Sequence, residues 1–95
     1  MNAVESIVSA YRVKCGFRYD REVAQSLGMT QAALSNYTKG KTRLPHIAIA
    51  KVSETTGIPA VGVMAAVNVT YAGTPEDEKA YWQEKLALLK ETVLS

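Results

Sequence analysis

The stretch DREVAQSLGMTQAALSNYTKG, residues 20–40, carries the most structural information in the sequence. Val23 and Leu27 are four residues apart, which places them on one face of a helix, and Gly28 then supplies the backbone freedom that a tight turn requires. Thr30 is a typical N-cap residue, so a second helix is expected to start directly after it. The stretch therefore predicts two short helices joined by a tight turn.

The second of these helices is predicted to have one buried side and one polar side. Leu34 is expected to fasten it to the core and to the preceding helix. Side chains of Gln, Asn, Ser and Thr suit the base edges in the major groove of DNA, which present paired hydrogen-bond donors and acceptors. The small, polar or basic residues expected on the exposed side are Thr30, Gln31, Ala32, Ser35, Asn36 and Lys39.

Helical patterns also precede and follow this pair, so the chain is predicted to be all-α. The further helices are expected over residues 2–15, 46–56, 59–71 and 75–94. In the second of these four, Ile47, Ala50 and Val52 are expected to face the core. Residues 67–71 also alternate in the manner of a strand, which leaves the end of that helix open.

The composition is typical of one compact domain in a reducing compartment. Of the 95 residues, 47% are hydrophobic and 21% are charged, which supports a single core and argues against disorder. The single cysteine, Cys15, excludes an internal disulfide and a cysteine-based zinc site, and no signal peptide is visible, so a cytoplasmic location is expected. The longest apolar stretch, residues 58–72, is too interrupted for a membrane span of ~20 apolar residues.

Charge is distributed unevenly along the chain. Residues 1–51 contain eight Lys and Arg against three acidic residues, a net charge of +5. Residues 52–95 contain three Lys against six acidic residues, a net charge of −3. A basic half suits a polyanionic partner, and an acidic half is better kept away from one.

Residues 20–45 resemble, without a gap, the helix-turn-helix and following loop of the lambdoid phage repressor and Cro-type regulators. The resemblance extends over about residues 3–66, and it implies a five-helix lambda-repressor-like DNA-binding domain over residues 1–72 with a C-terminal helix in residues 73–95. The residues that carry it are Val23, Ala24, Leu27, Gly28, Thr30, Gln31, Leu34, Ser35, Tyr37, Gly40 and the loop Lys41-Thr42-Arg43-Leu44-Pro45.

The resemblance also implies roles for single residues. Gln31 is expected to be the main base reader and Ala32 to place its methyl group against a thymine methyl, with Thr30, Ser35 and Asn36 on the same face. Asp20 departs from the glutamine that is frequent at its position, and we expect it to cap the helix while Arg21 takes over the phosphate contact. The residues expected at phosphates are Arg12, Arg21, Tyr37, Lys39, Lys41, Thr42 and Arg43.

The last predicted helix carries a narrow apolar seam with spacings of four, three and four residues. This seam either folds back onto the core of its own chain or pairs with a second copy. Pairing is favoured here, because two recognition helices about 34 Å apart bind a palindrome far better than one. The seam consists of Trp82, Leu86, Leu89 and Val93.

These observations predict a sequence-specific transcriptional regulator, a repressor of phage or prophage type that binds a palindromic operator in double-stranded DNA as a homodimer. Two alternatives stay open: an antitoxin with a toxin-binding tail, and a protein-interaction adaptor that has lost DNA binding. An enzyme is not expected, because no Ser/His/Asp set, paired-carboxylate site or phosphate-binding glycine loop is evident. No cofactor, metal ion, membrane or small-molecule ligand is expected either.

Overall fold

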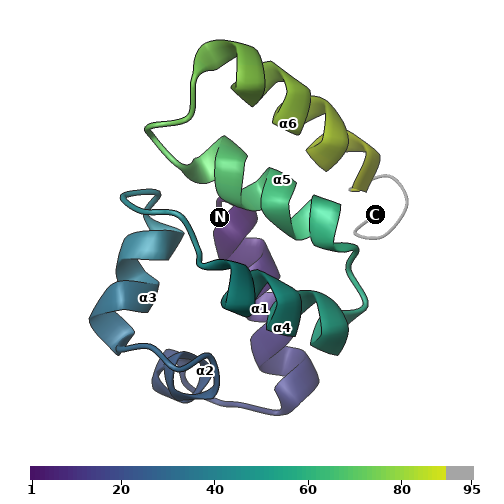
Figure 1. Cartoon of the computed structure of the whole chain (residues 1–95). Coiled ribbons are helices and arrows are strands. Elements are labelled where there is room, and N and C mark those ends of the chain that lie inside the picture. The colour runs from purple at the N-terminus through teal and green to yellow at the C-terminus, as the bar shows by residue number, and fades with distance from the viewer. Residues whose placement is uncertain (90–95) are drawn as a thin grey trace.

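The computed structural model of the chain describes residues 1–89, and these residues form helices and loops without a strand (Figure 1). The all-α prediction is thereby confirmed for this part of the chain, including the open segment 67–71, most of which is helical. The helices are α1 (Ala3–Cys15), α2 (Asp20–Ser26), α3 (Gln31–Thr38), α4 (His46–Thr56), α5 (Ala60–Thr70) and α6 (Glu76–Leu89).

Helices α1, α4 and α5 contact one another and form the centre of the molecule. The α2–α3 pair packs against α1 at one end, and α6 covers α5 at the other end (Figure 1). The core is made mainly of valine, alanine and leucine side chains from all six helices, and Val23, Val52 and Val63 are the largest fully buried ones. This arrangement places the second helix of the pair, α3, at the edge of the molecule.

Helix α6 shares the core of the other helices. Leu86 and Leu89 are buried, with 7% and 5% of their surface exposed, and they belong to the same apolar cluster as α1–α5. Gly62 in α5 permits this close approach, because a Cβ atom there would lie 2.8 Å from a methyl group of Leu89. The division of the chain at residue 72 stays a prediction, but the apolar packing is continuous across it.

The predicted core face of α4 is wrong in two of its three residues. Ile47 is 62% exposed and Ala50 is exposed, whereas Ala48, Ile49 and Val52 are buried. The segment from Ile47 to Ala50 is apolar at every position, so its periodicity does not select a side. The orientation of α4 follows from its contacts with α1 and α5.

Candidate DNA interface

The α2–α3 pair is joined by a turn that requires a glycine. Gly28 has a φ of +71°, in the left-handed region that residues with a side chain rarely adopt. Its N–H donates to the carbonyl of Gln25 over 3.1 Å, and the N–H of Met29 donates to the carbonyl of Ala24 over 2.9 Å. These two bonds end α2 and direct the chain into α3.

Helix α3 is held in place at its start and along its buried side. The hydroxyl of Thr30 accepts the N–H of Ala33 over 3.1 Å, so the predicted N-cap is confirmed. Leu34 is 2% exposed and belongs to the core cluster. The rotation of α3 about its own axis is therefore defined by Leu34.

The end of α3 is attached to two other elements. The side-chain amide of Asn2, the N-cap of α1, donates to the carbonyl of Thr38 over 2.7 Å. Gly40 has a φ of +77°, its carbonyl accepts the N–H of Ala72 over 3.0 Å, and a Cβ atom on it would collide with the carbonyl oxygen of Thr70. Helix α3 is thus fixed to α1 and to the end of α5, an anchoring that the sequence pattern did not reveal.

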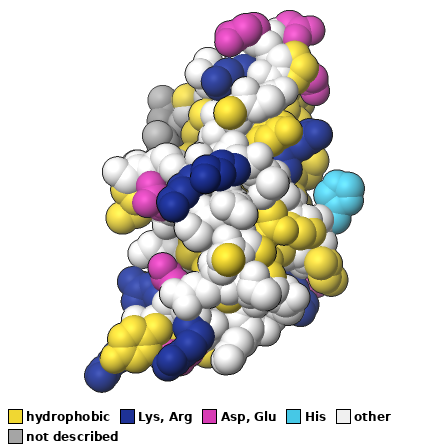
Figure 2. Space-filling model, turned by 90° about the vertical axis from the view of Figure 1, so that its left-hand side faces the viewer, with side chains coloured by type: hydrophobic (Ala, Val, Ile, Leu, Met, Phe, Trp, Pro, Cys, Tyr) yellow, Lys and Arg dark blue, Asp and Glu magenta, His cyan; other side chains and the backbone are white. Residues whose placement is uncertain are grey.

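The predicted reading face of α3 is exposed. Figure 2 looks onto the side of the molecule where α2 and α3 lie and shows Lys and Arg side chains spread over a surface that also carries hydrophobic and a few acidic side chains. Ser35 is the exception among the predicted base readers, because it is partly covered. The fully exposed members of this face are Thr30, Gln31, Ala32 and Asn36.

Gln31 has neighbours from the start of α2 on two sides. On one side it lines a hollow with Tyr19 and Arg21, and the Arg21 guanidinium carbon lies 5.8 Å from the centre of the Tyr19 ring. On the other side it shares a smaller hollow with Asp20. Tyr19 is 54% exposed and was missed by the sequence reasoning, although an aromatic residue beside an arginine was a visible signal.

The expected capping by Asp20 is wrong. Helix α2 begins at Asp20 itself, and Tyr19 occupies the N-cap position without a side-chain cap bond. The carboxylate of Glu22 accepts the N–H of Tyr19 over 3.2 Å, so this backbone donor at the start of α2 has a partner. Asp20 is left exposed near Gln31, where its negative charge influences which groups can approach.

The residues expected at phosphates fall into two groups. Arg21, Lys39, Lys41, Thr42 and Arg43 are exposed near α3 or in the loop that follows it. Arg12 and Tyr37 are half-buried, and the Arg12 guanidinium donates to the carbonyl of Phe17 over 3.4 Å. Arg43 lies over the ring of Tyr71, 5.1 Å from its centre. Three of the predicted cations, Arg12, Arg21 and Arg43, therefore already have partners within the chain.

The predicted seam of α6 is only partly described. Leu86 and Leu89 are buried against the core of their own chain, which is the first of the two interpretations that the pattern allowed. Trp82 is half-buried at the edge of this cluster. Val93 lies outside the described residues.

The largest group of acidic side chains lies in α6, whereas Asp20 lies beside Gln31 at the α3 face. The first turn of α6 holds Glu76, Asp77 and Glu78, and Figure 2 shows the largest group of acidic side chains at the end where α6 lies. Within residues 1–89, no group of His, Cys, Asp and Glu is arranged to hold a metal ion. No helix in that range is long and apolar enough to cross a membrane.

The comparison with protein families agrees with this geometry. A family model described as helix-turn-helix, of the Cro/C1 type, matches residues 8–63, which is more than half of the chain. The match contains the α2–α3 pair, the loop after it and α4, together with part of α1 and the start of α5. No curated protein and no solved structure matches the chain. The chain belongs to the Cro/C1-type helix-turn-helix family, whose members are DNA-binding transcriptional regulators.

Proposed function

We propose that this protein is a sequence-specific transcriptional repressor of phage or prophage type, which binds a palindromic operator as a homodimer. The observation that carries the proposal is the orientation of α3. Leu34 is buried while Gln31 and Asn36 are exposed, so the polar face of the helix points away from the core. An exposed helix of this kind fits into the major groove.

Base reading is assigned to the first turns of α3. Gln31 is the main reader, since a glutamine amide forms two hydrogen bonds with adenine, and Ala32 packs against a thymine methyl group. Thr30, Ser35 and Asn36 complete the face. Arg21 contacts a phosphate beside Gln31, which is supported by the hollow that the two side chains share with Tyr19.

Phosphate binding is assigned mainly to the segment after α3. Lys39, Lys41 and Thr42 are exposed there and precede Arg43, and contacts of this type set register and affinity without reading sequence. Arg12 and Tyr37 are half-buried and would offer the backbone only part of their side chains. The acidic first turn of α6 does not line the hollows around Gln31, although its Glu78 shares a groove with Arg43.

The homodimer would need side chains that remain exposed in the single chain. Leu86 and Leu89 are buried against α5, so a pairing through them would require α6 to leave its own core. Tyr81, on the same helix, is 51% exposed and is available to a second copy. A contact through the outer side of α6 keeps both the core and the α3 faces intact.

The two alternative functions receive less support. A toxin-binding tail would need an unpacked C-terminal segment, yet α6 packs on α5 along its described length. An adaptor without DNA binding would not need an exposed Gln31 beside Arg21. Both alternatives are therefore less consistent with the packing than a repressor is.

The test is selection of bound DNA from a random pool with the full chain. We expect one enriched motif made of two inverted half-sites about 10 base pairs apart, the spacing that two recognition helices impose. An enriched motif without inverted symmetry would contradict the dimer. The absence of any enriched motif would contradict sequence-specific binding altogether.

A further inference from the structure

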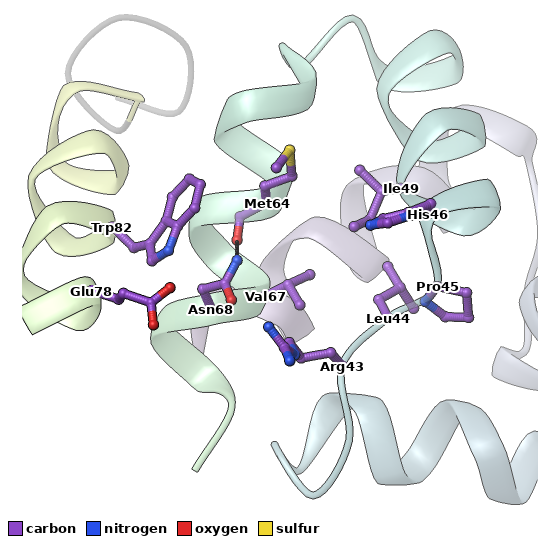
Figure 3. Close-up of a pocket in the computed structure, with 10 residues that line it drawn as sticks. All are labelled: Arg43, Leu44, Pro45, His46, Ile49, Met64, Val67, Asn68, Glu78 and Trp82. Atoms are coloured by element: carbon purple, nitrogen blue, oxygen red, sulfur yellow. Dashed lines mark hydrogen bonds between the residues drawn. The ribbon is translucent and has the colours of Figure 1, made fainter. Parts of the chain in front are cut away.

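A groove of about 490 Å³ lies between the loop after α3 and helices α4, α5 and α6 (Figure 3). This volume is within the range of about 300–1,000 Å³ that small-molecule sites occupy. The groove is separate from the reading face of α3, because neither Gln31 nor Asn36 lines it.

The groove has an apolar floor and a polar rim. Leu44, Ile49 and Val67 form the floor, and each is buried. The rim carries one cation, one carboxylate, one imidazole, one amide and one indole. These rim groups belong to Arg43, Glu78, His46, Asn68 and Trp82.

Four of the rim groups come together at one end of the groove. Figure 3 shows Arg43 from the loop, Asn68 from α5 and Glu78 from α6 at this end, with Trp82 next to Glu78. The amide nitrogen of Asn68 donates to the carbonyl of Met64 over 2.9 Å, which leaves its carbonyl oxygen as an acceptor for a ligand. The tertiary structure thus joins a positive and a negative group from distant parts of the chain.

The presence of both charges restricts the ligand. A ligand with only a carboxylate would be attracted by Arg43 and repelled by Glu78. A ligand with only an ammonium group would be attracted by Glu78 and repelled by Arg43. A zwitterion satisfies both groups, and an apolar body would cover the floor beside Trp82. We propose that this groove binds a small zwitterion with an apolar side chain, of the chemical class of an apolar amino acid.

In this site the ligand carboxylate pairs with the Arg43 guanidinium, and the ligand ammonium donates to Glu78 and to the free oxygen of Asn68. The Arg43 guanidinium carbon also lies 5.1 Å from the centre of the Tyr71 ring. Arg43 is also one of the phosphate-binding residues of the proposed function. Occupation of the groove therefore competes with DNA for this side chain, a consequence that rests on the proposed function.

The site can be tested on the free protein, without DNA. Trp82 is the only tryptophan of the chain, so its fluorescence reports directly on the groove. Phenylalanine is the probe, with 3-phenylpropanoate, which lacks its ammonium group, and phenethylamine, which lacks its carboxylate, as controls. We expect a saturable change in Trp82 emission with phenylalanine and binding weaker by about tenfold or more for each control, as for the loss of one charge-assisted hydrogen bond.

Matched variants assign the response to the groove. Glu78→Gln should weaken phenylalanine binding by about tenfold. Glu76→Gln removes an equally exposed carboxylate from the same helical turn, which does not line the groove, and should leave binding unchanged. No saturable change, equal binding of all three probes, or equal effects of both variants would overturn the proposal. An emission change that follows protein concentration and not phenylalanine would overturn it in favour of a second copy as the occupant.

The coupling to DNA is read separately. Phenylalanine should lower the affinity of the wild-type chain for DNA, and the phenylalanine concentration that gives half of this effect should be about tenfold higher for Glu78→Gln, whose phosphate-binding residues are intact. A saturable Trp82 signal with unchanged DNA affinity would overturn the competition through Arg43. If the chain bound no DNA at all, the proposed function would fail while the fluorescence titration still decided the ligand site.

Discussion

Helices α3 and α6 are the two segments for which the sequence predicted an external partner, and the structure treats them differently. Helix α3 leaves Gln31 and Asn36 exposed and buries Leu34 alone, whereas α6 buries Leu86 and Leu89 from its predicted seam. A polar face is costly to bury unless each of its hydrogen-bonding groups finds a partner, so its residue types favour exposure. An apolar seam can be buried against any apolar surface, so its residue types do not show whether it packs on its own chain or on a second copy.

The largest effect is expected from a substitution that disturbs the attachment of α3 to the end of α5. Gly40→Ala should lower the free energy of unfolding by about 2–5 kcal/mol, because a side chain is strained at φ +77° and would collide with the carbonyl oxygen of Thr70. Gly28→Ala is the control, with a φ of +71° but no atom within 4 Å of the added Cβ. It should cost about 1–2 kcal/mol in urea unfolding. Equal losses would contradict the attachment of α3 to the end of α5.

Leu86→Ala tests whether the apolar seam of α6 packs within its own chain. Removing this buried side chain should lower the free energy of unfolding by about 2–4 kcal/mol. The loss should be the same at low and high protein concentration, because the contact lies within one chain. Thermal unfolding over a wide concentration range measures this. A loss that grows with dimer formation would show that the seam pairs between copies.

A smaller effect is expected for the reading face itself. Gln31→Ala should reduce the binding free energy for the selected operator by about 1–3 kcal/mol and change binding to random DNA little. Gln25→Ala is the matched control, since Gln25 is also an exposed glutamine but lies in α2. Titration of each variant with operator DNA and with random DNA measures the two affinities. Equal losses on operator and random DNA would exclude base reading by Gln31.

The smallest effect concerns the loop after α3. Lys41→Ala should weaken binding to all sequences alike and lower the slope of log affinity against log salt by about 0.9, the value for one phosphate contact. Lys85→Ala removes a lysine whose ammonium lies over the Tyr81 ring in α6, 5.1 Å from its centre, and should leave the slope unchanged. A salt series for both variants would separate a phosphate contact from a general change in net charge.

Much of the α2–α3 pair was predictable because its signals are local. The Thr30 cap, the Gly28 turn and the Leu34 anchor each depend on neighbours within a few residues. Prediction from the sequence failed where neighbouring residues could each fill the same structural position. Asp20 and Tyr19 were confused at the start of α2, and the uniformly apolar start of α4 did not reveal that Ile47 is exposed.

The sequence by itself determined the all-α class, the turn between α2 and α3, and the polar character of the α3 face. These properties follow from backbone preferences and side-chain polarity, which act over one or two helical turns. Only the tertiary structure decided that α6 packs on α5, that Asn2 holds the end of α3, and that Arg43 and Glu78 line one groove. Such contacts join residues tens of positions apart, and packing selects them among many apolar and charged surfaces that are locally equivalent.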